Sequence, residues 1–387
     1  MIKNKIDRLI SSRRTLLGVG PMSVNCVDAS IELANEHNQI IMLIASRRQI
    51  DSADFGGGYV NNWTTDEFAQ YVNNKDKKGK IILARDHGGP WQNPIEIEKN
   101  YGLQQAMDSA KLSYSKDIDA GFQFLHIDPS IDIHGKPDLD EILDRIYELY
   151  EFCWSYAQRL GRKLIFEIGT EEQSGSTNTI DELDYTLSSI TTFCRINKIP
   201  PPSFVVMQTG TRVMETQNLG SYDSPIRVAG EIPPEIQIPQ MVELCNQYGI
   251  YMKVHNTDYL SDEALKWYPR LGLHSANVAP EFGVAETRAL ISILEENNLS
   301  NLSEQFLELA FLSNKWEKWM LKDTKASDRE KSIIAGHYVF ATEACAEIVK
   351  EAGSKLRPLG VDLNNYLKDQ VKLTIQRYLK HFRMIAE

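Results

Sequence analysis

Residues 81–90, IILARDHGGP, set the pattern of this chain, in which a short apolar run ends at acidic and imidazole side chains. The same pattern recurs in FQFLHIDPS (122–130), KLIFEIGTEE (163–172) and YMKVHNTDY (251–259). Short apolar runs bounded by turn-forming residues are typical of buried β-strands. A parallel barrel points the C-terminal ends of all its strands into one mouth, where residues distant in sequence meet. The four segments therefore predict a shared site whose imidazoles and carboxylates suit a divalent metal.

Strand-like runs alternate with amphipathic stretches through most of the chain. Strands separated by helices predict a parallel sheet, and eight such units favour an α/β fold closed into a TIM (β/α)8 barrel. An open doubly wound sheet is the alternative, although no G-x-G-x-x-G motif follows the first strand. The predicted strands are Thr15–Val24, Ile40–Ala45, Lys80–Arg85, Phe122–Ile127, Lys163–Ile168, Ser203–Gln208, Ile250–Val254 and His274–Val278.

The last part of the chain has a different pattern, which is helical throughout and contains a single proline, Pro358. We therefore expect two regions, a barrel over residues 1–298 and a C-terminal helical extension over residues 299–387. The extension is expected to pack on the barrel or on a neighbouring subunit. Its aromatic residues recur at helical spacing, so packing is a better explanation for them than cofactor binding.

Net charge, apolar runs and cysteine spacing limit the kinds of molecule that this chain is expected to bind. The formal net charge of -11 disfavours binding to nucleic acid or to an anionic membrane, because both surfaces repel an acidic protein. No apolar run approaches the ~20 residues that span a bilayer, and the polar start lacks the apolar stretch of a signal peptide. The five cysteines form no CxxC pair, as expected for reduced thiols. We expect a cytoplasmic protein that binds small molecules or other proteins.

Six segments, taken together and in order, resemble the accessory, Z-type subunit of class II D-tagatose-1,6-bisphosphate aldolase. The resemblance covers nearly the whole chain and implies a TIM barrel of the class II aldolase type. Members of that family are described as noncatalytic partners of a zinc aldolase subunit, and related barrels epimerise ketoses. The segments are ADFGGGYVNNWTTDEFAQYV (53–72), IILARDHGGP (81–90), AGFQFLHIDPS (120–130), FEIGTEE (166–172), VVMQTGTRV (205–213) and MKVHNTDY (252–259).

The predicted metal ligands are His87, Glu171 and His255, with Gln208 as a fourth group. In the segment FEIGTEE the family motif ends in I-G-T-E, so the resemblance favours Glu171 over Glu167. Gln208 stands where a class II aldolase carries another histidine, and the accessory subunits also have glutamine there. An amide oxygen binds metal less tightly than an imidazole. Zinc is the expected ion.

The predicted catalytic residues are Asp86 and Asp128. Neighbouring residues of a strand point to opposite faces, so we expect His87 to bind the metal while Asp86 acts on the substrate. Asp128 matches the family's H-L-D motif and is a candidate proton carrier. His126 lies on the same face but deeper in the barrel, and we expect it to be structural.

Two predicted substrate-binding residues, Arg48 and Gln49, lie in the loop after the second strand. Arg47-Arg48-Gln49 replaces a neutral S-N-Q of the family. The added charge suits a carboxylate or phosphate of the substrate, and pairing with Asp51 and Asp54 is the alternative.

Four more substrate-binding candidates are Gly57, Tyr59, Asp258 and Glu281. Gly57 belongs to a glycine run that allows close approach of a ligand, and Tyr59 could stack on a sugar. Glu281 follows the eighth strand, where the family has uncharged residues and phosphate-binding barrels cradle the phosphate. Unless Glu281 points away, its carboxylate predicts a substrate without a phosphate at that end.

These residues predict a metal-dependent enzyme that acts on a ketose or ketose derivative by retro-aldol cleavage or by epimerisation. Both reactions use a metal to polarise an oxygen and a carboxylate to move a proton. Two other functions fit the sequence. One is a noncatalytic accessory subunit that stabilises a tagatose-bisphosphate aldolase, and the other is a sugar-binding protein without chemistry. A homo-oligomer is expected in either case.

Overall fold

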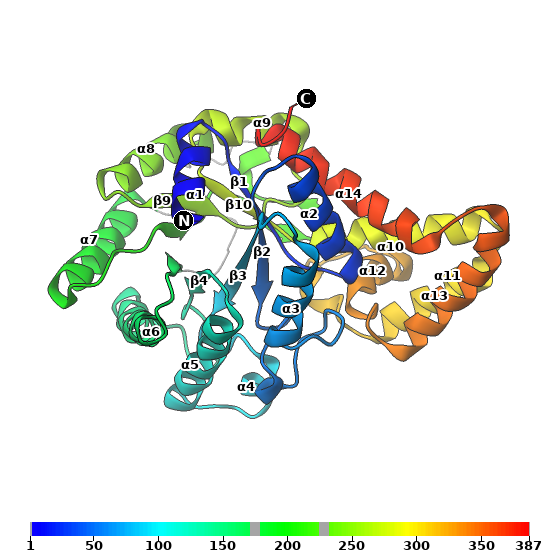
Figure 1. Cartoon of the computed structure of the whole chain (residues 1–387), viewed down its shortest axis with the longest axis horizontal. Coiled ribbons are helices and arrows are strands. Elements are labelled where there is room, and N and C mark those ends of the chain that lie inside the picture. The colour runs from blue at the N-terminus through cyan, green and yellow to red at the C-terminus, as the bar shows by residue number, and fades with distance from the viewer. Residues whose placement is uncertain (1, 171–178, 224–231, 387) are drawn as a thin grey trace.

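Eight parallel strands form a closed barrel, in the spatial order β1-β10-β9-β6-β5-β4-β3-β2 (Figure 1). The computed structural model describes residues 2–170, 179–223 and 232–386. Each of the eight predicted runs overlaps one barrel strand, so the predicted TIM barrel is confirmed. The strands are β1 (Leu16–Val19), β2 (Ile41–Ser46), β3 (Ile81–Gly88), β4 (Phe124–Ile127), β5 (Ile165–Ile168), β6 (Phe204–Met207), β9 (Tyr251–Val254) and β10 (Ser275–Val278).

Helices cover the outside of the barrel, and local sequence fixes where many of them begin. Reciprocal capping boxes start α3 at Thr64, α6 at Asp138 and α7 at Thr179, because each cap residue is followed three positions later by Glu. The helices up to the last strand are α1 (Ile2–Ser11), α2 (Val24–Glu36), α3 (Thr65–Lys75), α4 (Pro94–Glu98), α5 (Leu103–Ala120), α6 (Leu139–Arg159), α7 (Ile180–Asn197), α8 (Pro234–Gln247) and α9 (Asp262–Leu271).

The chain after the last strand is helical, with α10 (Pro280–Glu296), α11 (Ser300–Leu312), α12 (Asp328–Ala335), α13 (Glu343–Leu356) and α14 (Leu363–His381). Figure 1 shows α11 and α13 grouped at one end of the molecule, while α14 returns beside α2. Val371 and Ile375 of α14 belong to the barrel core, whereas Leu367 belongs to a second core with Leu290 and Phe306. The last helix is therefore shared between the two cores, and the boundary at residue 298 stays a prediction.

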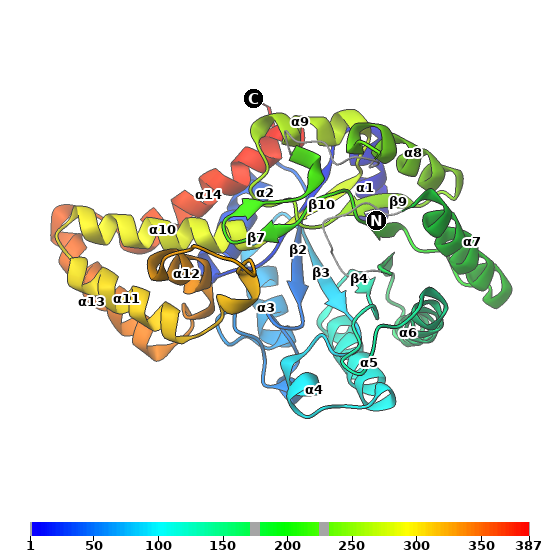
Figure 2. The ribbon, with the colours of Figure 1, turned by 180° about the vertical axis from the view of Figure 1, so that it is seen from behind.

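A small hairpin, β7 (Val213–Met214) and β8 (Gln217–Asn218), joins the barrel to the tail. The backbone N–H of Glu215 donates to Trp319 O at 2.7 Å, and Thr324 Oγ1 donates to Glu215 Oε1 at 2.6 Å. Figure 2 shows β7 beside the tail segment that leads to α12. This contact fixes the short helix η3 (Glu317–Trp319) near the barrel mouth. None of the described helices is long and apolar enough to cross a membrane.

Candidate metal centre

Four buried side chains converge at the C-terminal ends of β3, β4, β5 and β9. Asp86, His126, Glu167 and His255 each offer a donor atom, and these atoms all lie within 4.8 Å of one another. Within this set, His255 Nε2 is 3.4 Å from Glu167 Oε1 and 3.7 Å from Asp86 Oδ1. The strand ends of the barrel therefore do meet in one polar cluster, which the motifs predicted.

The donor spacing fits a divalent ion. A tetrahedral zinc with ligands at about 2.1 Å separates its ligand atoms by about 3.4 Å. Glu167 Oε1 and His255 Nε2 also lack a hydrogen bond in the described structure, although both are buried. Buried polar atoms normally have a partner, so two unsatisfied atoms at this spacing are the signature of a ligand position. Asp86, Glu167 and His255 are thus the residues that would hold the metal.

His87 departs from ordinary strand geometry, and this corrects the expectation that Asp86 and His87 face opposite ways. Its φ is +43°, and the pairing of β3 with β4 shifts register between Arg85 and Gly88. This bulge turns the imidazole inward, so that His87 Nε2 lies 4.0 Å from Asp86 Oδ2. Both side chains of the Asp-His pair consequently reach the same cluster.

A chain of polar contacts fixes the imidazole of His87. Its Nδ1 lies 2.6 Å from Asp128 Oδ2, and its Nε2 lies 3.2 Å from Nδ1 of His255. Asp128 is held in turn by Ser130, whose hydroxyl donates to Oδ1 at 2.6 Å. Asp128 is buried, does not line the mouth cavity and contacts the ring of His87, while its role as a proton carrier stays a prediction.

His126 is poorly placed to bind a metal, although it belongs to the cluster. Its Nδ1 accepts the backbone N–H of His87 at 3.2 Å, which uses the lone pair that faces Asp86 and Glu167. Its Nε2 abuts the backbone of Gly169, where an added Cβ would lie 2.5 Å away. The imidazole therefore supports the bulge at His87, in keeping with the expected structural role.

Lys253 is the residue of the cluster that sequence reasoning missed. Its Nζ lies 2.8 Å from Glu167 Oε2, and both side chains are buried inside the barrel. The signal was present, because Lys253 precedes His255 by two positions and so shares its inward face. The ammonium group of Lys253 therefore compensates the negative charge of Glu167 within the cluster.

The charges of the cluster are strongly coupled. Burial alone would raise the pKa of Glu167, but Lys253 and His126 lower it to about 2. Burial would lower the pKa of His87, but the carboxylates of Asp86 and Asp128 raise it to about 9. Burial lowers the pKa of His255 to about 4. At neutral pH without metal, the imidazole of His87 is therefore positively charged, whereas that of His255 is neutral.

Neither of the two other predicted metal ligands, Gln208 and Glu171, is among the four residues of this cluster. Gln208 directly follows β6 and is buried at the mouth end of that strand. Glu171 lies outside the described residues. Glu167, which the family motif disfavoured, occupies the position on β5 from which a carboxylate reaches His255.

A cavity of about 260 Å³ opens directly above the cluster. Of the predicted substrate-binding residues, Arg48, Gln49, Tyr59 and Asp258 line it, together with Asp86, His87 and His255. The tail contributes Lys318, Trp319 and Tyr338 to its wall, which the sequence analysis did not foresee. A neighbouring cavity of about 530 Å³ shares part of that wall and is lined by Gly57.

Two predicted substrate-binding residues, Gly57 and Glu281, make contacts within the protein that account for their positions. Gly57 has a φ of +76°, and an added Cβ would lie 3.0 Å from Asn62 O and Trp63 O, so the loop itself requires glycine. The carboxylate of Glu281 accepts hydrogen bonds from the Tyr259 backbone and the Tyr378 hydroxyl. Glu281 therefore points away from the cavity and fastens α14 to the barrel, which differs from the expected position in a phosphate cradle.

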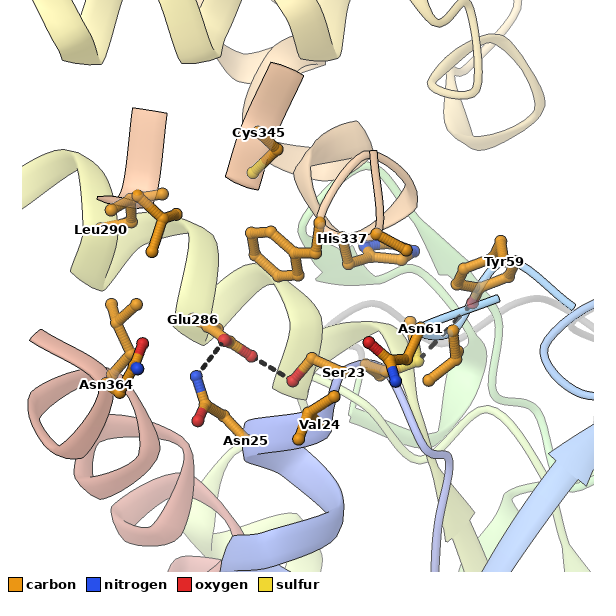
Figure 3. Close-up of a pocket in the computed structure, with 16 residues that line it drawn as sticks. Ser23, Val24, Asn25, Tyr59, Asn61, Glu286, Leu290, His337, Cys345 and Asn364 are labelled. Atoms are coloured by element: carbon orange, nitrogen blue, oxygen red, sulfur yellow. Dashed lines mark hydrogen bonds between the residues drawn. The ribbon is translucent and has the colours of Figure 1, made fainter. Parts of the chain in front are cut away.

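A third, smaller cavity of about 140 Å³ lies between the barrel and the tail (Figure 3). Glu286 of α10 reaches into its wall, where Asn25 Nδ2 donates to Oε1 at 2.7 Å and the Ser23 hydroxyl donates to Oε2. Figure 3 shows His337 and Tyr59 toward one side of the cavity and Leu290 and Asn364 toward the other. The carboxylate is satisfied by neutral donors, and burial raises its pKa.

Residues 10–193, a little under half of the chain, match the family described as D-tagatose-1,6-bisphosphate aldolase subunit GatZ/KbaZ-like. The resemblance to the Z-type subunit family is confirmed over these residues. They contain the Asp86-His87 motif, His126, Asp128 and Glu167. No curated protein matches the chain.

Solved structures share the fold at low sequence identity. A protein from Sinorhizobium meliloti 1021, titled a probable tagatose 6 phosphate kinase, superposes with a TM-score of 0.75 at 16% identity, covering 95% of this chain and 100% of that one. Fructose-bisphosphate aldolase from Campylobacter jejuni gives 0.57 at 11% identity, over 99% and 94% of the two chains. Fructuronate-tagaturonate epimerase UxaE from Cohnella laeviribosi gives 0.56 at 12%, over 96% and 81%. These likenesses establish the barrel architecture.

Proposed function

We propose that the chain is a sugar enzyme of the class II aldolase type, which acts on a ketose or ketose derivative by retro-aldol cleavage or epimerisation. The observation that carries the proposal is the set of donor atoms from Asp86, Glu167 and His255, spaced for a divalent ion beneath a cavity. The match to an aldolase subunit family supports the same substrate class. We further propose zinc as the ion and the cytoplasm as the location, in keeping with five free cysteines.

The side chains around the cavity have distinct tasks in this proposal. A bound metal would polarise a carbonyl or hydroxyl oxygen of the sugar. The imidazoles of His87 and His255 hold the pKa of Asp86 well below its ordinary value against the effect of burial, so this carboxylate is ionised. Its place in the cavity wall is the reason for assigning it the role of proton acceptor. Asn277 Nδ2 donates to Asp86 Oδ1 at 3.1 Å and orients that carboxylate. Asp128 keeps the ring of His87 in place.

A noncatalytic accessory subunit is the second candidate, and one observation favours it. The ammonium of Lys253 already compensates Glu167, so the cluster carries an internal cation where a catalytic site would rely on the metal. The family description, which names an aldolase subunit, agrees with such a role. In that case the chain would stabilise a separate aldolase subunit.

Two measurements on the purified chain separate these functions. Bound metal is quantified by plasma mass spectrometry before and after soaking with zinc. Ketoses, ketose phosphates and nucleotide-linked sugars are then incubated with the protein in deuterated water and followed by NMR. An enzyme should hold stoichiometric metal and exchange a substrate hydrogen. A chain that takes up no divalent metal and exchanges no hydrogen would be an accessory or binding protein.

A further inference from the structure

The usual phosphate position of a barrel is filled by the protein itself. Phosphate-binding barrels hold the anion with backbone N–H groups after strands seven and eight, at a helix N-terminus. Here those strands are β9 and β10. Asp258, which follows β9, accepts the N–H groups of Ala279 and Glu281 at the start of α10, each at 2.9 Å. The donors that would cradle a phosphate are thus engaged by a carboxylate of the same chain.

A second carboxylate, that of Glu281, lies near this position but points away from the cavity. Glu281 lies in the first turn of α10, and its partners Tyr259, Tyr378 and Arg377 keep it in place. Burial, and after it the charge of Glu281, raises the pKa of Asp258 to about 7. Like charges at short range repel an incoming anion. An oxyanion of the substrate must therefore bind on another wall.

The opposite wall offers two cations. Arg48, from the loop after β2, and Lys318, from η3 of the tail, both line the 260 Å³ cavity and its 530 Å³ neighbour. Among residues 2–170, 179–223 and 232–386, neither side chain forms an ion pair with a carboxylate. The adjacent Arg47, in contrast, is buried and forms ion pairs with Asp51 and Glu96.

Aromatic side chains hold Lys318 in position. Its Nζ lies 4.9 Å from the ring centroid of Trp319 and 5.0 Å from that of Tyr338. Trp319 Nε1 donates to the Tyr338 hydroxyl at 3.1 Å, which links η3 to the next tail segment. Two cations that line the same cavities, neither paired with a carboxylate among the described residues, favour an anionic ligand there.

We propose that Arg48 and Lys318 bind an oxyanion, either a phosphate monoester or a carboxylate, at the end of the substrate that lies away from Asp86 and His255. The substrate class is then a ketose with one anionic terminus. The assignment to a substrate rests on the proposed function. The oxyanion site itself rests on the two cations, the shared cavity wall and the closed cradle at α10.

Titration calorimetry of the purified full chain tests the site without sugar turnover. The probes are inorganic phosphate and, separately, D-gluconate as a carboxylate. Lys318→Ala and Arg48→Ala should each weaken binding of the preferred probe by roughly tenfold or more, because each removes a charge-assisted contact. Lys322→Ala, an exposed lysine of the same tail segment, is the matched control and should change affinity by less than about twofold. The stronger probe identifies the source of the oxyanion.

Several results would overturn the proposal. They are failure of the unmodified chain to bind either probe at millimolar concentration, unchanged affinity in both cation variants, or tighter phosphate binding after Asp258→Asn, which would locate the anion at α10. Since the titration requires no metal and no reaction, it can fail while the metal and hydrogen-exchange experiments succeed. The opposite result, an oxyanion site in a chain without activity, would remove only the proposed function.

Discussion

Two buried carboxylates, Glu167 and Glu286, show how differently this barrel treats the same group. Glu286 is 4% exposed and Glu167 is 0% exposed. The oxygens of Glu286 accept hydrogen bonds from Ser23 and Asn25, whereas Glu167 Oε1 has no hydrogen bond in the described structure. Burial removes both carboxylates from water, which is unfavourable. Only for Glu286 do hydrogen bonds from neutral donors offset this loss of solvation.

The pKa values of the two carboxyl groups move in opposite directions for this reason. Burial raises the pKa of Glu286, and its neutral partners do not reverse that effect. Burial acts in the same direction on Glu167, but Lys253, His126 and His255 together outweigh it. A buried carboxylate that stays ionised and has a free oxygen is available for a ligand. The comparison therefore separates a structural glutamate from a candidate metal ligand.

The largest expected effect concerns Asp86, which shares the mouth with Glu167. Asp86→Asn keeps size and hydrogen-bonding capacity but removes the proton acceptor, so hydrogen exchange into a ketose should fall by roughly 10²–10⁴. Metal binding should weaken but persist, because Glu167 and His255 are unchanged and the amide oxygen of the new Asn is a weaker ligand than the carboxylate of Asp86. Asp66→Asn, at an exposed position of α3, is the control. Loss of metal in the Asp86 variant would instead make Asp86 a required ligand.

The next effect tests the comparison directly. Glu167→Gln should weaken zinc binding by roughly 100-fold or more, since even groups that only orient metal ligands change affinity by about 10–100-fold. Glu286→Gln should leave zinc affinity unchanged, because its carboxylate faces the cavity between barrel and tail. Competition titration with a zinc chelator measures both. Equal affinities in the two variants would break the distinction between the carboxylates.

A smaller effect is expected from the Asp128–His87 pair in the metal-free protein. A histidine pKa raised to about 9 adds stability that is complete below about 6.5 and is lost as pH rises through about 9. Asp128→Asn should therefore destabilise the fold at pH 6 by on the order of 1–2 kcal/mol, allowing for the partial exposure of His87. Urea unfolding at pH 6 and pH 10 should show this gap narrowing. A constant gap would attribute the effect to packing.

The smallest effect is predicted for Glu286. Its raised pKa means that the ionised carboxylate is disfavoured in the folded state, so wild-type stability falls as pH rises above the unfolded pKa of about 4.3. Glu286→Gln keeps an acceptor for Ser23 or Asn25 and removes this dependence. Stability at pH 8 should change by less than about 1 kcal/mol. A strongly destabilised variant in thermal unfolding would show that the charge itself holds the tail to the barrel.

Apolar runs and their polar ends were sufficient to predict the barrel and half of its candidate site. The runs are short and end at residues that stop strands, so the eight-strand count followed without tertiary information. His87 and His255 were found because an imidazole at the end of an apolar run is conspicuous. Their rings do meet, with His87 Nε2 at 3.2 Å from His255 Nδ1.

Residues inside the strands were harder to judge. Glu167 and Lys253 each interrupt an apolar run, and sequence alone offers no measure of whether they face each other across the barrel. They do so because β6, which lies between β5 and β9, sets their separation. The bulge at His87 is also invisible in the sequence, since it depends on support from His126 on the adjacent strand.

The sequence by itself therefore determined the fold class, the mouth as the site, and the presence of imidazoles and carboxylates there, because strand period and strand ends are local properties. Only the tertiary structure decided which carboxylates are free. It turned Glu281 toward α14 and placed Asp258 on the backbone of α10. It also carried Lys318 from the tail to the mouth. These outcomes depend on contacts between segments far apart in the chain, and no local pattern encodes such contacts.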